Sequence, residues 1–208
     1  MFKMTTQQIN MSNYPEIIAN INEYVKNLFN QYPASDLVYH NLKHTEKVVE
    51  NAAKIAGTFS LCESEMFILV AAAWFHDTGH LFGTQQLHED HSVQIMKNML
   101  KEQNIDKKLI DEIEKCICAT KFPHKPKSLL EEIICDADTY NLGTEDFLIT
   151  DDSLKKELEL RSTPTKNWEE NTLDFLISHK YFTPYCRELL NRGKEENIDL
   201  VRYLLQKK

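Results

Sequence analysis

The chain has 208 residues, of which 42% are hydrophobic and 27% charged, and its formal net charge is −8. This length and composition are ordinary for one globular domain with a sizeable core, so we expect a single domain over residues 1–208. The acidic excess argues against nucleic acid or an anionic membrane as a partner, because 32 acidic side chains would repel phosphates.

Apolar residues recur at spacings of three and four along the chain, and only 5 Gly and 6 Pro interrupt them. This periodicity predicts an all-α protein. The expected helices span residues 12–32, 40–57, 63–77, 88–103, 106–120 and 129–143, with two or three more between 151 and 208. The segment 63–77 is the most apolar and is expected to be the central helix. No linker or repeat indicates a second domain.

Histidines are concentrated in the middle of the chain, where seven of the eight lie between His40 and His124. Imidazole is a common metal ligand and proton carrier near neutral pH. His40 and His44 are four residues apart, as are His76 and His80, so on a helix each pair would share one face. This spacing alone also fits surface or structural histidines.

Carboxylates follow two of the apolar segments. Asp77 follows the apolar helix directly, and Asp136 and Asp138 follow the apolar run "LLEEII". Burying an unpaired carboxylate costs several kcal/mol, and a metal cation can compensate for that cost. Three segments therefore each deliver an imidazole or a carboxylate from an apolar helix, and one metal site explains all three together.

The order of these residues resembles a known family. His44, the pair His76–Asp77, and Asp138 reproduce the H…HD…D order of the HD superfamily of metal-dependent phosphohydrolases. Five blocks over about residues 39–143 look like the core of class I cyclic-nucleotide phosphodiesterases. These blocks are "YHNLKHTEKVV", "HDTGHLFGTQQ", "EDHSVQIMKNML", "ATKFPH" and "CDADTYNLG". The resemblance implies an all-α, phosphodiesterase-like helical bundle of the HD-domain type, with helical extensions at both ends.

The resemblance also implies the ligands of the principal metal, which would be His44, His76, Asp77 and Asp138. Nitrogen and oxygen ligands of this kind suit one or two divalent ions, with manganese, iron, cobalt, nickel, zinc and magnesium as candidates. A hydroxide activated by the metal would attack phosphorus, so Asp77 counts as catalytic as well.

Two further histidines acquire catalytic roles from the resemblance. His40 matches the histidine that protonates the departing ester oxygen, and His80 matches one beside the phosphate and the second metal. The alternative that His40 only hydrogen-bonds a metal ligand stays open.

Other residues are weaker candidates. His91 and His124 are candidates for contacts to a second metal or a phosphate, and Asn41, Asn141 and Lys121 for the substrate pocket. Solvated or structural positions are expected for His88, Arg161, Lys166 and His179.

The chain departs from the phosphodiesterases in two places. No counterpart is found for the helix whose glutamine grips the purine, and Lys121 stands in "ATKFPH" where those enzymes have an acid. The expected function is therefore hydrolysis of a small phosphoester, a nucleotide that is either a monoester or a diester. Three alternatives remain: a cyclic-nucleotide phosphodiesterase, a diiron oxygenase using His91 and His124, and a non-catalytic sensor in which the metal ion is purely structural.

The expected location is the cytoplasm. Residues 1–10 lack the apolar core of a signal peptide, and no apolar run is long enough to span a bilayer. Five unpatterned cysteines, without a second pair after Cys116 and Cys118, indicate reduced thiols and no zinc site of paired cysteines. The oligomeric state is left open.

Overall fold

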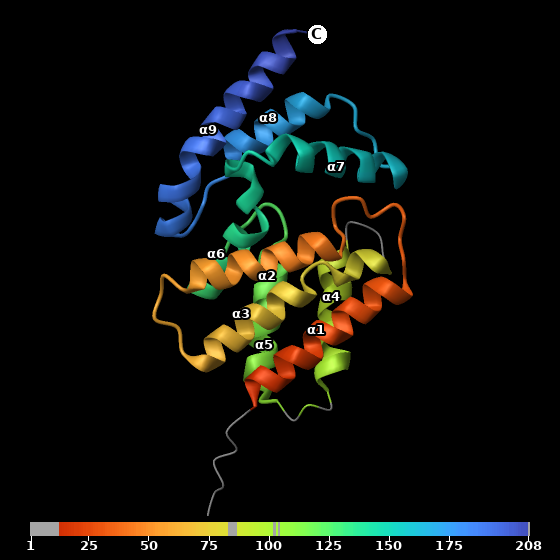
Figure 1. The fold of residues 1–208 in the computed structure, drawn as a ribbon, viewed down its shortest axis with the longest axis vertical. Helices are drawn as coiled ribbons and strands as arrows, with labels where there is room; N and C mark the ends of the chain where they lie inside the picture. Colours follow the sequence, from red (N-terminus) through yellow and green to blue (C-terminus); the bar gives the residue numbers. More distant parts are fainter. Residues whose placement is uncertain (1–12, 83–86, 102, 104, 208) are drawn as a thin grey trace, which may run out of the picture.

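A computed structural model of the chain describes residues 13–82, 87–101, 103 and 105–207 (Figure 1). Every regular element in these ranges is helical, which confirms the predicted all-α class. The α-helices are α1 (Tyr14–Gln31), α2 (Leu42–Ala56), α3 (Glu63–Phe75), α4 (His88–Leu100), α5 (Lys107–Ala119), α6 (Leu129–Asp138), α7 (Phe147–Leu160), α8 (Trp168–Ser178) and α9 (Pro184–Gln206). Two short 3-10 helices are η1 (Thr78–Leu81) and η3 (Tyr140–Gly143). The first residues of the chain and positions 83–86 of the "HDTGHLFGTQQ" block lie outside the described residues.

Helix α2 begins two residues later than the sequence predicted. The side chain of Asn41 accepts hydrogen bonds from the backbone N–H groups of Lys43 and His44, so Asn41 is the N-cap and the helix starts at Leu42. The prediction that His40 lies on this helix is therefore wrong. The predicted helix 129–143 is also interrupted, because α6 ends at Asp138 and a 3-10 turn follows.

Helix α3 is the central helix, as predicted from its composition. It packs against α1, α2, α5 and α6, and its residues from Ala71 to Phe75 are all buried. An apolar helix buried on every side is stabilised by burial of roughly 1.5–3 kcal/mol for each large side chain. Because α3 ends inside the protein, the chain that leaves it places His76 and Asp77 in the interior, where both are buried.

Helices α7, α8 and α9 form the other end of the molecule in Figure 1, beyond α6 and η3. A second, smaller core holds this end together, made of Leu142, Phe147, Leu176 and Val201.

Asp136 joins α6 to the start of α9. It accepts hydrogen bonds from the backbone N–H groups of Phe182 and Thr183, each at 2.8 Å, and from the Thr183 hydroxyl at 2.7 Å. The sequence offered Asp136 together with Asp138 as a metal-compensated carboxylate, but its compensation comes from these three donors.

All five cysteines lie in described segments and are free thiols, as expected. No helix within the described ranges combines the length and the apolar character needed to cross a membrane.

Candidate metal centre and cavity

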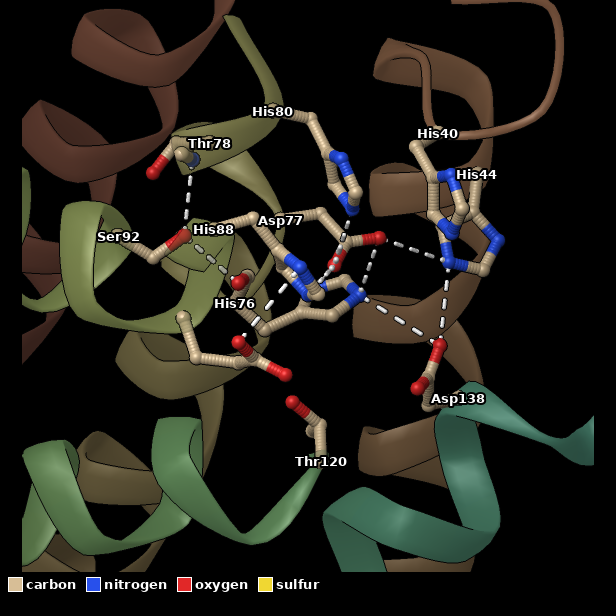
Figure 2. Close-up of polar contacts among 12 residues, drawn as sticks. His40, His44, His76, Asp77, Thr78, His80, His88, Ser92, Thr120 and Asp138 are labelled. Carbon is tan, nitrogen blue, oxygen red and sulfur yellow. Dashed lines mark hydrogen bonds and ion pairs between the residues drawn. The ribbon is translucent and has the colours of Figure 1, made fainter. Parts of the chain in front are cut away.

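Four side chains from three helices meet at the inner end of α3 (Figure 2). His44 comes from the first turn of α2, His76 and Asp77 from the residues after α3, and Asp138 from the last residue of α6. One ligand atom of each lies within 4.8 Å of the others. The Nε2 atom of His44 is 3.1 Å from Asp138 Oδ1 and 3.3 Å from Asp77 Oδ2. The sequence predicted this set, and the structure brings all four together.

The surrounding backbone orients His76. Its Nδ1 atom lies 2.9 Å from the carbonyl oxygen of Ala73, which accepts the Nδ1 proton and leaves Nε2 as the lone-pair nitrogen. The Ser92 hydroxyl on α4 donates to the carbonyl of His76 and accepts from the N–H of Gly79. Gly79 is required here, because a Cβ atom at this position would overlap the backbone of α4.

The donor set fits a divalent cation. Two ligands of one ion at about 2.0–2.2 Å can be at most roughly 4.4 Å apart. His76 Nε2 lies 3.1 Å from Asp77 Oδ2 and 3.6 Å from Asp138 Oδ1, within that limit. The Nε2 atom of His76 and the Oδ2 atom of Asp77 are buried without a well-formed hydrogen bond. Buried polar atoms without partners are costly, and a cation between them would satisfy both.

The two carboxylates shift the acid–base equilibria of this cluster. Burial lowers the pKa of His44, but hydrogen bonds to Asp138 and Asp77 outweigh it and raise the pKa to about 9. Burial lowers the pKa of His76, but the charges and hydrogen bonds of Asp77 and Asp138 together outweigh it, and the net shift is upward. Burial raises the pKa of Asp138, but hydrogen bonds to the two imidazoles outweigh it and the net shift is downward. A cation must therefore displace protons from these imidazoles when it binds.

A second group uses the other oxygen of Asp77. One ligand atom from each of His40, Asp77 and His80 lies within 4.8 Å of the others. The ring of His80 is stacked between His40, at a centroid distance of 4.2 Å, and His88, at 3.9 Å. His88 Nε2 is 3.6 Å from Asp77 Oδ1. The expectation that His88 is solvated is wrong, because the close packing of η1 on α4 brings its ring against that of His80.

Arg161 lies behind His80. Its Nη2 donates to the backbone oxygen of His80 at 3.2 Å, and its Nη1 is 3.4 Å from His80 Nδ1. Burial, followed by the positive charge of His40, lowers the pKa of His80 to about 2. A neutral His80 that accepts from Arg161 at Nδ1 carries its proton on Nε2. Arg161 is thus not the surface residue that the sequence suggested.

Glu157 on α7 is the residue that sequence analysis missed. Its Oε1 atom is 2.6 Å from His40 Nδ1, and its Oε2 accepts from the backbone N–H groups of Tyr39 and His40 at 2.8 and 2.9 Å. Burial raises the pKa of Glu157, but the bonds from His40 outweigh it and the net shift is downward. The carboxylate is therefore ionised at neutral pH, and it holds His40 beside the cluster although His40 is not on a helix.

A weak signal for Glu157 does exist in the sequence. Phe147, Thr150, Leu154, Glu157 and Arg161 follow one another at spacings of three or four, which makes one face of a helix. The first three line the cavity, while Glu157 and Arg161 continue the face toward His40 and His80.

The clusters open into a cavity of about 680 Å³. His40, Asp77 and Asp138 line it together with residues of η3, α7 and α8. Three weaker candidates, Lys121, His124 and Asn141, line this cavity.

Asn41 does not line this cavity, since its side chain is used as the cap of α2. His91 and His124 belong to neither His/Asp group of the described residues. His124 hydrogen-bonds the carbonyl of Thr120 instead. The ligand set that a diiron oxygenase would need from them is therefore not assembled.

Two other residues behave as the sequence suggested. Lys166 is exposed, and His179 is a buried structural residue whose Nε2 is 3.0 Å from the Thr139 hydroxyl. Burial lowers the pKa of His179 to about 3.

Comparison with known families gives one match. A family model described as HD domain matches residues 41–142. The match runs from the cap of α2 into η3, so it contains all four residues of the first group and leaves out α7, α8 and α9. No curated protein and no solved structure matches the chain.

Proposed function

Because this chain carries an HD domain and so belongs to a superfamily that consists mostly of metal-dependent hydrolases, we propose that it hydrolyses a small phosphoester. The substrate class that we propose is a nucleotide, either a phosphomonoester or a phosphodiester. The observation that carries the proposal is that a metal-type His/Asp cluster and a hydrogen-bonded His40–Glu157 pair lie at the same cavity, which Asp77, Asp138 and His40 line.

The four residues of the first group would hold the cation: His44, His76, Asp77 and Asp138. When bound, a divalent cation supplies Lewis acidity, which lowers the pKa of water and draws charge from a phosphoryl oxygen. The burial of His76 and Asp77 strengthens every electrostatic interaction made there.

His40 is the residue that we assign to protonation of the leaving oxygen. Its Nδ1 is bound by Glu157, so Nε2 is the nitrogen left to exchange a proton in the cavity. Glu157 stabilises the charged ring and fixes its orientation, as a carboxylate does for a general-acid histidine elsewhere. In this proposal His40 therefore exchanges a proton with the substrate and does not only hydrogen-bond a metal ligand.

We assign His80 to the phosphate. The Nε2 atom of His80 is buried without a hydrogen-bond partner among the described residues, and a phosphate oxygen would supply the acceptor. His80 does not itself line the cavity, so the phosphate would have to reach it past the lining residues His40 and Asp77. The charge of Arg161 behind the ring favours an anion on its other side.

A metal and substrate panel tests the function. Purified protein would be loaded with Mn²⁺, Co²⁺, Ni²⁺, Zn²⁺, Fe²⁺ or Mg²⁺, its metal content measured, and its turnover of nucleoside monophosphates, cyclic nucleotides and simple phosphomonoesters recorded. We expect turnover of at least one nucleotide and its loss in Asp77→Ala. Metal-loaded protein that turns over none of these compounds, or an Asp77→Ala variant as active as the parent, would refute the proposal.

A further inference from the structure

The cavity is much larger than a phosphate group requires. Its volume of about 680 Å³ lies in the range of roughly 300–1,000 Å³ that is usual for whole small-molecule sites. Much of its lining comes from α7 and α8, which follow the last residue of the family match, residue 142. This part of the chain therefore builds a compartment for the rest of the substrate.

Aromatic rings contribute to the lining of this compartment. Phe147, Trp168 and Phe175 come from α7 and α8, and Phe122 comes from the loop after α5. The rings of Phe122 and Phe175 lie 5.2 Å apart at an angle of 60°. Phe122 is 55% exposed, so one face of this ring system is available to a ligand. Such rings bind a planar π-system by stacking.

Trp168 is held in place before any ligand arrives. Its indole N–H donates to Asp151 Oδ2 at 2.8 Å, and the hydroxyl of Thr172 donates to the other oxygen, Oδ1, at 3.0 Å. Asp151 is on α7, whereas Trp168 and Thr172 are on α8, so these bonds join the two helices. A ring fixed in this way loses little entropy when a ligand stacks on it.

The same lining presents amide acceptors. Asn141 uses its NH₂ group to donate to the Thr150 hydroxyl at 2.9 Å, and Asn171 uses its own to donate to the carbonyl of Lys166. Within the described segments neither Oδ1 atom has a hydrogen-bond donor, and both residues line the cavity. Amide oxygens of this kind suit the N–H groups on the edge of a nucleobase. A lipid chain would have no use for these amide oxygens.

We propose that α7 and α8, together with Phe122, form a nucleobase subsite in which the base of a nucleoside phosphate stacks against Trp168 and Phe175. This inference rests on the proposed function for the position of the phosphate, at His40 and the His/Asp groups. Trp168 and Phe175 determine specificity in this arrangement, and Asp151 is a positioning residue that acts through Trp168.

Binding to the metal-free protein tests the subsite without any catalysis. The chain has two tryptophans, and Trp74 is buried in α3, so tryptophan fluorescence can report on Trp168. We expect adenosine and its 5′-monophosphate to quench the emission, with corrections for absorbance from a free tryptophan derivative. Ribose 5-phosphate should leave the emission unchanged. Trp168→Phe should abolish the quenching, because Trp74 does not line the cavity.

Variants then compare binding with turnover. Phe175→Leu should weaken nucleotide binding by about tenfold, the usual effect of losing one stacking ring. It should raise KM for the nucleotide by a similar factor. Ile177→Ala is the matched control, since Ile177 is exposed on the same helix and does not line the cavity. Circular dichroism of each variant would check that the helices are intact.

The two proposals fail in different ways. Quenching by adenosine without hydrolysis of any phosphoester would refute the proposed function and leave the subsite standing. Hydrolysis of phosphoesters without quenching, or with an unchanged nucleotide KM in Phe175→Leu, would overturn the subsite alone.

Discussion

Replacing Glu157 by glutamine tests the assignment of His40 most directly. Glu157 binds His40 Nδ1 at 2.6 Å through one oxygen and two backbone N–H groups through the other. Glutamine has the same shape and can keep the two backbone bonds with its carbonyl oxygen. Its NH₂ group then faces Nδ1, so a protonated ring loses its counter-charge and meets a donor in place of an acceptor.

The expected fall in kcat/KM of Glu157→Gln follows from the hydrogen bond between residue 157 and His40 that is lost. A hydrogen bond to a charged group contributes about 1.5–3 kcal/mol, so kcat/KM should fall roughly 10- to 150-fold. Stability should fall by only about 1 kcal/mol, because the backbone donors stay paired. Glu157→Ala leaves three buried donors unpaired and should lower the free energy of unfolding by about 3 kcal/mol. Glu159→Gln, an exposed change on the same helix, should do neither.

The assay compares two leaving groups. A nucleoside alkoxide needs a proton to depart, whereas a nitrophenolate departs without one. Glu157→Gln should therefore slow hydrolysis of a nucleotide but barely affect a nitrophenyl phosphoester, and His40→Asn should show the same contrast. Equal loss on both substrates would refute the assignment of His40 as the acid, as would a Glu157→Gln variant with parental activity on nucleotides.

Three further outcomes are expected from the structure. Metal-free protein should lose stability as pH rises from about 6.5 to about 9. The pKa of His44 is about 6.5 in the unfolded chain and is raised to about 9 in the folded protein, so the stabilising charge of His44 is complete only below about pH 6.5. Melting temperatures measured against pH test this, and a flat profile would contradict it. Gly79→Ala should cost about 2 kcal/mol in urea unfolding, because its Cβ would overlap the backbone of α4, whereas Gly57→Ala, which has room, should be neutral or stabilising. Asp136→Ala should lower the free energy of unfolding by about 3 kcal/mol without changing metal affinity, whereas Asp138→Asn should weaken metal binding with little loss of stability. Equal metal affinities of the two variants in metal titrations would contradict this separation of roles.

The sequence by itself determined the class of fold and the membership of the first group. Helical periodicity depends only on local spacing, so the all-α class and the central position of α3 could be predicted. His44, His76, Asp77 and Asp138 could be predicted to meet because their order resembles a family pattern. Three of them, His76, Asp77 and Asp138, also lie at the end of an apolar segment that has to be buried, which favours an interior position.

Only the tertiary structure decided how the other groups are used. Asp136 and Asp138 are two residues apart and look alike in the sequence, but the backbone of residues 182–183 binds one and leaves the other for the cluster. His40 and Glu157 are 117 residues apart, and their contact depends on how α7 packs against the rest of the bundle. His88 looks like a surface histidine until Gly79 allows η1 to pack closely on α4. Such contacts depend on the packing of distant helices, which local periodicity does not specify.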